Sequence, residues 1–96
     1  MRNRYLVTYD ICDEKRLRRV FKKTGAFGVH VQYSVFQCDL SPRELALMKS
    51  SLDPLLKHDV DQILIVDLGP VEGRGSVSIS SLGLPYRPRE RRPVVV

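Results

Sequence analysis

The chain has 96 residues, 43% of them hydrophobic, and carries 16 Lys and Arg against 11 Asp and Glu, a net charge of +5. This length fits one small domain. No apolar run approaches the ~20 residues of a membrane span, and no signal peptide precedes the first apolar segment, so we expect a cytoplasmic protein that does not contact membranes. The two cysteines lack metal-ligand spacing and indicate neither a disulfide framework nor a zinc site. The basic balance favours an anionic partner such as a nucleic acid.

The first predicted element is a strand over Arg4–Asp10, because the five residues between its ends are apolar, aromatic or β-branched. Asp10 stands where this strand leaves the sheet. Its carboxylate therefore stays partly hydrated and is able to bind a hard cation such as Mg²⁺ through oxygen. An Asp at a strand-to-helix junction is also a common turn former or helix cap. From this segment alone, both interpretations stay open.

A strongly basic helix is predicted next, over Asp13–Thr24, with Asp13 as its N-cap and Gly25 as its terminator. Six basic and two acidic residues between Asp13 and Gly25 give a balance of +4. One face is apolar and holds Leu17, Val20, Phe21 and Thr24; the opposite face holds Lys15, Arg18, Arg19 and Lys22, with Arg16 and Lys23 at its edge. Such a face is either simply solvated or a phosphate-binding surface. Its single sign of charge favours phosphate binding.

Apolar residues alternate through Gly28–Leu40, which predicts two short strands joined by a tight turn near Gln32–Ser34. A second helix is predicted to begin at Ser41. There, Ser41 and Glu44 form a capping box, with a proline at the first helical position. Pro54 should kink or shorten this helix, because proline lacks the N–H that a helix interior needs.

The last predicted elements are a strand over Asp61–Leu68, a glycine-rich loop to Gly75 and an edge strand over Ser76–Leu82. This order is that of an α+β, ferredoxin-like split βαβ fold (βαββαβ) with an antiparallel sheet and an additional C-terminal edge strand. Residues 1–83 then form a single domain, and residues 84–96 a basic Pro/Arg-rich tail that either frays or orders on a partner. Both helices would cover one face of the sheet. We therefore expect a homodimer in which a second copy covers the other face.

Several of these residues together resemble one known family. Tyr9-Asp10-Ile11 ends the first strand, and basic residues follow through Arg19 and Lys22. The run Val31-Gln32-Tyr33-Ser34-Val35-Phe36 comes next and is followed by Cys38. This combination extends over most of the chain and resembles CRISPR-associated protein 2.

The resemblance implies a ferredoxin-like homodimer in the adaptation step of CRISPR antiviral defence. Some members look like metal-dependent endonucleases acting on RNA or duplex DNA. Others are non-catalytic bridges between dimers of the CRISPR-associated integrase. The family's catalytic, metal-binding Asp matches Asp10, with Mg²⁺ or Mn²⁺ as the implied ion, and Tyr9, Ser34 and Phe36 match its supporting residues. The natural nucleic-acid contacts are Arg16, Arg18, Arg19 and Lys22.

The residues allow a sparse hydrolytic site. One Asp10 from each of two chains would hold one Mg²⁺ near the two-fold axis, where a bound water would attack the phosphorus. The sequence offers no evident His base and no carboxylate cluster, so a dimeric scaffold whose basic helices track a duplex backbone stays an alternative. A single-strand RNA binder of the same topology would need a Lys/Arg-Gly-Phe/Tyr run, which this sequence lacks. Two positions depart from the family pattern: Gln37, which is usually Glu, and His30, which is often Arg or Lys.

Overall fold

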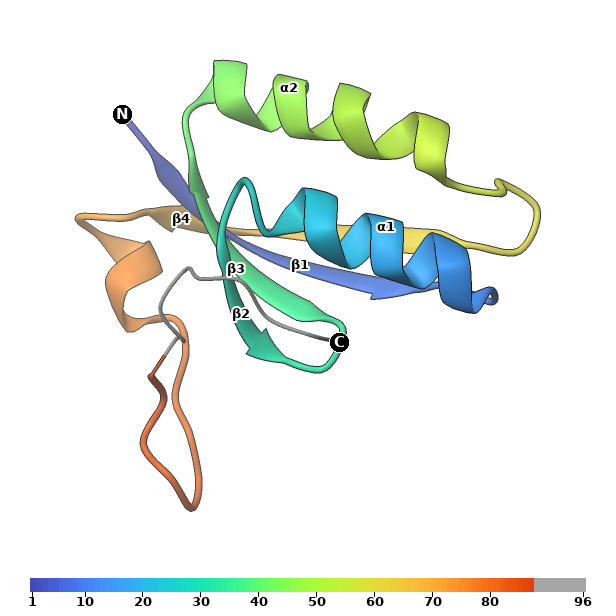
Figure 1. Ribbon diagram of the computed structural model, residues 1–96. Coiled ribbons are helices and arrows are strands. Elements are labelled where there is room, and N and C mark those ends of the chain that lie inside the picture. Colours follow the sequence, from blue (N-terminus) through green and yellow to red (C-terminus); the bar gives the residue numbers. More distant parts are fainter. Residues whose placement is uncertain (88–96) are drawn as a thin grey trace.

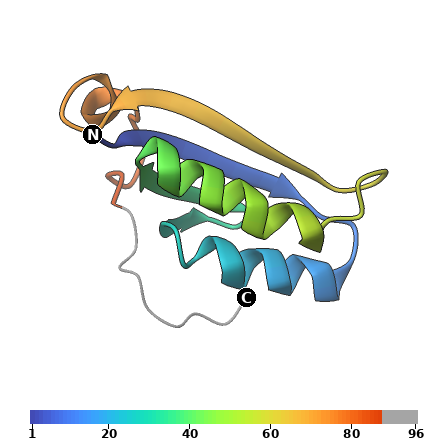
Figure 2. The ribbon, with the colours of Figure 1, turned by 90° about the horizontal axis from the view of Figure 1, so that it is seen from above.

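The computed structural model of the protein describes residues 1–87, and four strands and two α-helices form this part of the chain. In chain order the elements are β1 (Asn3–Asp10), α1 (Glu14–Thr24), β2 (Val29–Gln32), β3 (Val35–Leu40), α2 (Pro42–Leu52), the 3₁₀ turn η1 (Asp53–Leu55), β4 (Gln62–Pro70) and the 3₁₀ turn η2 (Arg74–Val77). The strands form one antiparallel sheet in the order β2-β3-β1-β4. Both helices lie on one face of it (Figures 1 and 2). The α+β class and the βαββαβ order are confirmed.

The core lies between the sheet and the two helices. Alternate residues of β1 point towards the helices, and Tyr5, Val7 and Tyr9 are at most 8% exposed. The buried apolar side chains of the described residues are Tyr5, Val7, Tyr9, Val20, Phe21, Phe36, Cys38, Leu40, Met48 and Leu52. Because α1 buries its apolar face here, its basic face is turned outwards. Within residues 1–87, no helix has the length and apolar character that a membrane crossing requires.

The opposite side of the sheet, called the open face below, carries neither α1 nor α2; η2 packs against it at the end away from Asp10, where Arg4 Nη1 donates to Gly75 O at 3.5 Å. Leu64 and Val66 of β4 point towards it and are 51% and 45% exposed. Asp10 lies on the same face, because its Cα pairs with Gln62, two residues before Leu64. The last carboxylate of β1 therefore projects from the side of the sheet that the helices leave uncovered.

Local sequence signals set the ends of both helices as predicted. The Asp13 side chain caps α1 by accepting a hydrogen bond from the backbone N–H three residues further on, at 3.0 Å. At the start of α2, Ser41 and Glu44 form the reciprocal capping box, with distances of 2.8 Å and 3.2 Å. Pro54 lies in η1, and α2 has already ended at Leu52.

The predicted edge strand over Ser76–Leu82 is wrong. The chain instead turns through η2 and then continues without regular structure to the end of the described residues. Serine hydroxyls explain the difference: Ser76 Oγ donates to Gly73 O and Ser78 Oγ to Arg74 O, and such local bonds compete with pairing in a strand.

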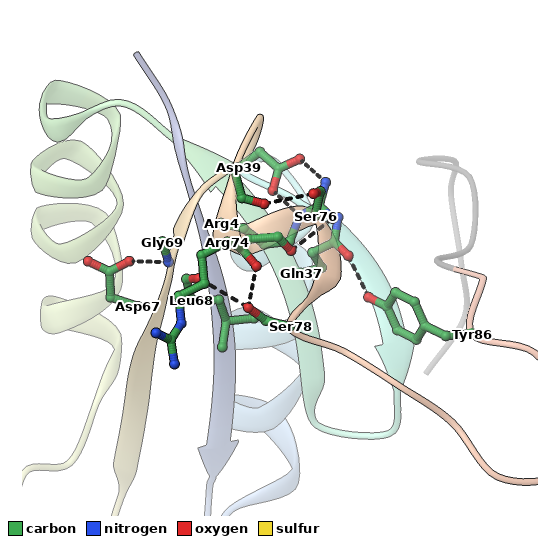
Figure 3. A network of polar contacts seen from close by, with 12 residues as sticks. Arg4, Gln37, Asp39, Asp67, Leu68, Gly69, Arg74, Ser76, Ser78 and Tyr86 are labelled. Carbon is green, nitrogen blue, oxygen red and sulfur yellow. Dashed lines mark hydrogen bonds and ion pairs between the residues drawn. The ribbon is translucent and has the colours of Figure 1, made fainter.

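This segment is also tied to the sheet by contacts that extend no strand (Figure 3). The Ser78 hydroxyl, whose proton is shared between two carbonyl oxygens, lies 3.2 Å from Leu68 O as the longer branch beside Arg74 O, and Tyr86 Oη donates to Gln37 Oε1 at 2.5 Å. The chain after β4 therefore returns to the sheet through side-chain contacts. Residues 88–96, which contain most of the predicted tail, lie outside the described residues.

Gly28, directly before β2, is a position where the backbones approach closely. A Cβ built there would lie 2.3 Å from the carbonyl oxygen of Gln37 and 2.4 Å from Cys38 Sγ. Gly28→Ala should therefore force β2 away from β3 and lower the free energy of unfolding by about 3 kcal/mol, measured by urea denaturation. In the control Gly25→Ala the new Cβ lies no closer than 3.4 Å to its neighbours, so stability should stay near that of the wild type. Equal stability of the two variants would contradict this packing.

Candidate functional site

Asp10 is the final residue of β1, where the arrow of that strand ends in Figure 1. Its side chain is exposed, and it makes no hydrogen bond or ion pair within residues 1–87. The predicted alternative, a capping role, belongs instead to Asp13, which caps α1. The Asp10 carboxylate is therefore free of competing protein donors and available to a ligand.

The two sequence motifs that carried the family resemblance meet at this end of the sheet. The Tyr9 N–H donates to the carbonyl oxygen of Ser34, in the turn between β2 and β3, at 3.1 Å. The Tyr9 ring lies against Phe36, with 6.3 Å between ring centroids. Burial of the ring raises the pKa of Tyr9 to about 12, so its hydroxyl stays protonated. Tyr9, Ser34 and Phe36 thus fix the backbone that presents Asp10.

His30 belongs to the support of this turn. Its Nε2 lies 2.7 Å from the carbonyl oxygen of Tyr33, and Nε2 carries the proton because a carbonyl oxygen only accepts. The ring packs edge-on against Phe21 and is tilted against Phe36, with centroid distances of 5.1 Å and 5.2 Å. The other nitrogen, Nδ1, is buried without a hydrogen-bond partner among the described residues. This environment makes His30 a structural residue of the turn.

The outward face of α1 presents Arg18, Arg19 and Lys22, all exposed as predicted. Arg18 forms an ion pair with Glu14 one turn earlier in the helix, and both side chains are more than half exposed. Arg19 and Lys22 make no ion pair within residues 1–87. Because α1 begins four residues after Asp10, its first turn lies at the same end of the sheet as the carboxylate. The basic helix and the carboxylate therefore share one end of the sheet, with the helix packed on one face and the carboxylate directed to the other.

Arg16 differs from the other predicted phosphate contacts, because it has a partner within the protein. Its guanidinium is bound by Asp61, with 2.7 Å from Nε to Oδ2 and 3.2 Å from Nη2 to Oδ1. This pair occupies the Nε/Nη2 edge of the guanidinium and leaves Nη1 as the nitrogen of Arg16 without a hydrogen-bond partner within residues 1–87. Sequence reasoning missed Asp61, because the partners are 45 residues apart and no local pattern joins them. One sequence feature could have indicated a partner for Arg16: its position at the boundary between the apolar and basic faces of the helix.

A single chain offers few side chains that could bind a metal ion. Residues 1–87 contain no group of three or more His, Cys, Asp or Glu side chains placed to hold an ion. Asp10 is a single exposed carboxylate whose oxygens have no protein partner in the described chain. Mg²⁺ keeps several waters and takes one or two carboxylates together with phosphate oxygens. This carboxylate therefore fits such an ion, with two copies of the chain supplying two.

Comparisons with known proteins identify the family of the chain. The family model described as "CRISPR associated protein Cas2" matches residues 2–72, which include Asp10 and all of α1. The chain is 38% identical to the CRISPR-associated endoribonuclease Cas2 of Geobacter sulfurreducens over 96 residues, the whole of both chains. It is 40% identical over 92 residues to the CRISPR-associated endoribonuclease Cas2 1 of Rhodospirillum rubrum, covering 96% of this chain and 89% of that one.

Solved structures share the fold. The crystal structure of Streptococcus pyogenes Cas2 at pH 6.5 superposes with a TM-score of 0.71 at 34% identity, covering 83% of this chain and 99% of that chain. The hypothetical protein TT1823 from Thermus thermophilus superposes with a TM-score of 0.76 at 30% identity, covering 93% of this chain and 100% of that one. These similarities extend over the strand that ends on the candidate carboxylate and the basic helix after it.

Proposed function

Because the chain belongs to the CRISPR-associated protein Cas2 family, we propose that it is a metal-dependent endonuclease of CRISPR adaptation that works with the CRISPR-associated integrase. The observation that carries this proposal is the exposed, unpaired Asp10 carboxylate at the end of β1, directly before a helix with an outward basic face. The names of the curated relatives favour RNA as substrate, and duplex DNA is the second candidate.

In the proposed site, each residue has a limited task. The two Asp10 carboxylates of a homodimer hold one Mg²⁺ or Mn²⁺ ion, which when bound supplies an activated water and neutralises charge on the phosphate. Arg18, Arg19 and Lys22 bind the phosphate backbone and hold its position along α1. Tyr9 and its partners keep the end of β1 in place, so that the carboxylate does not move away from the bound strand.

Metal dependence is the direct test of this function. Purified protein is incubated with end-labelled RNA or duplex DNA while Mg²⁺ or Mn²⁺ is titrated, and cleavage is followed by gel electrophoresis. We expect cleavage only when the divalent cation is present, loss of cleavage in EDTA, and recovery when the cation is restored. Cleavage that continues unchanged in EDTA would contradict the proposed site.

A non-catalytic scaffold is the second candidate, and the small donor set favours it. One chain contributes a single free carboxylate, and residues 1–87 hold no cluster of metal-ligating side chains. The basic faces of two α1 helices would then track a duplex and bridge integrase dimers without chemistry. Salt-dependent binding of duplex DNA, with no cleavage at any cation concentration, would support the scaffold function over the nuclease function.

Both candidates require a homodimer, which we expect to form through the open face. Light scattering should give a mass twice that of the 11.0 kDa chain at micromolar concentration. Leu64→Glu combined with Val66→Glu should produce a folded monomer, because both side chains are about half exposed in one chain and charge opposes their burial between two. The control Leu47→Glu alters a side chain on α2 that is 58% exposed and should stay dimeric. A wild-type monomer at these concentrations would refute the expectation.

A further inference from the structure

Asp61 is the one buried carboxylate of the described chain, and its two oxygens accept four hydrogen bonds. The side chain is 0% exposed. Oδ1 accepts from the Cys12 N–H at 3.0 Å and from Arg16 Nη2 at 3.2 Å. Oδ2 accepts from Arg16 Nε at 2.7 Å and from the Lys57 N–H at 2.9 Å. Four donors use the full accepting capacity of a carboxylate, so the group is held in a single orientation.

These bonds join the segments that surround Asp10. Cys12 lies two residues after Asp10, in the short connection to α1. Arg16 lies in the first turn of α1, the helix that carries the basic face. Asp61 itself directly precedes Gln62, whose Cα is paired with that of Asp10 in the sheet. One buried side chain therefore ties the connection after the candidate carboxylate, the start of the basic helix and the beginning of β4 to one another.

The electrostatics keep this cluster charged. The Arg16 guanidinium, assisted by the two backbone N–H groups, holds the pKa of Asp61 well below its usual range, although burial acts in the opposite direction. The same pairing raises the pKa of Arg16. Both groups therefore keep their charges near neutral pH, so the contact is a permanent ion pair there.

Two other arginine–carboxylate pairs in the described chain, called forks because each has two hydrogen bonds, differ from Arg16–Asp61 in the burial of the carboxylate. Arg2 binds Glu44 and Arg4 binds Asp39, each with one bond of 2.9 Å and one of 3.1 Å. Their carboxylate side chains are 38% and 33% exposed, against 0% for Asp61. Neither fork contacts the connection between β1 and α1. The Arg2–Glu44 fork is therefore a matched control of similar geometry away from the site.

We propose that Asp61 is a positioning residue of the nuclease site: through the Cys12 N–H and Arg16 it fixes the Asp10 carboxylate relative to the basic face of α1, and so sets the affinity for the divalent cation. This inference rests on the proposed function, because it requires Asp10 to hold the cation. Groups one shell outside a metal ligand commonly act in this way, by orienting the ligand that touches the ion.

The test uses Asp61→Asn, which keeps the shape of the side chain and removes its charge. Mn²⁺ binding is measured by electron paramagnetic resonance on dimeric protein shown to be folded by circular dichroism, and cleavage is measured as kcat and KM for RNA. We expect the Kd for Mn²⁺ to rise by about 10-fold or more and kcat to fall by a similar factor. KM should stay within about twofold of the wild type, because the cations of α1 that hold the phosphates remain. The control Glu44→Gln should leave all three quantities unchanged.

A second variant covers the case in which Asp61→Asn does not fold. Arg16→Lys keeps the positive charge and loses the two-pronged geometry, so it should fold and show a smaller rise in Kd, about threefold or more. Wild-type Mn²⁺ affinity in folded Asp61→Asn, or in Arg16→Lys if the former is unfolded, would overturn the positioning role. If Asp10→Asn binds Mn²⁺ as tightly as the wild type, the proposed function fails and the inference fails with it. Loss of binding in Asp10→Asn with wild-type binding in Asp61→Asn would reject the inference alone.

Discussion

Asp10→Asn should reduce cation-dependent cleavage by on the order of 100-fold or more, while the fold, the dimer and nucleic-acid binding persist. The substitution keeps the size of the side chain and removes the charge that binds the cation. The side chain of Asp10 is exposed and makes no hydrogen bond or ion pair within residues 1–87, so its replacement breaks no polar interaction of the described chain. The loss should therefore appear in kcat, measured with RNA at saturating Mg²⁺, and leave the thermal midpoint of unfolding unchanged.

Asp59→Asn is the matched control for this variant. Asp59 is also exposed and unpaired in the described chain, and it lies in the loop before β4. It should cleave at the wild-type rate. Undiminished cleavage by Asp10→Asn, in protein shown to be free of contaminating nuclease, would falsify the assignment of the metal to this carboxylate.

The second large effect concerns affinity. Replacing Arg18, Arg19 and Lys22 by Ala should weaken binding to about the same extent for all sequences, because phosphate contacts carry no sequence information. The slope of log K against log salt for duplex DNA should become shallower by about 0.9 for each lost contact. The ion pair between Arg18 and Glu14 offers little resistance to binding, since exposed pairs of this kind contribute little stability. Fluorescence anisotropy over a range of salt concentrations gives both quantities.

A triple variant with the same change of net charge provides the control. Arg43, Lys49 and Lys57 are exposed cations on α2 and in the loop that follows it. Their replacement by Ala should lower the affinity slightly and leave the slope close to that of the wild type. If both triple variants have the same slope, the basic face of α1 is a solvated surface and not the binding site.

Most of the fold could be predicted because its signals are local. A run of apolar, aromatic and β-branched residues identified β1, and the separation of apolar and basic positions identified α1 together with the face that it buries. Ser41 and Pro54 marked the two ends of α2 through backbone chemistry that acts within four residues. Asp10 was found for the same reason, because a charge that ends an apolar strand is visible without any knowledge of the partner strands.

The features that the sequence did not reveal depend on interactions that are not local, or on a local interaction that was overlooked. The partner of Arg16 is brought to it only when β4 pairs with β1, so its ion pair is a consequence of the completed sheet. The segment Ser76–Leu82 alternates like a strand, yet its serine hydroxyls bond to nearby carbonyl groups and turn the chain instead. Periodicity describes which side chains share a face and does not say whether a neighbouring strand exists to pair with.

The position of β4 at the edge of the sheet has a consequence for aggregation. Its run of apolar residues over 63–66 stands beside backbone groups with no strand partner in residues 1–87. Such an edge is a template on which unfolded copies of the chain add as extra strands. Asp67 places a charge at the end of the run, and Pro70 ends the strand with a residue that lacks an N–H to donate. These two residues act as gatekeepers, and they protect a strand in which Ile63 and Ile65 must stay apolar because they pack against the core.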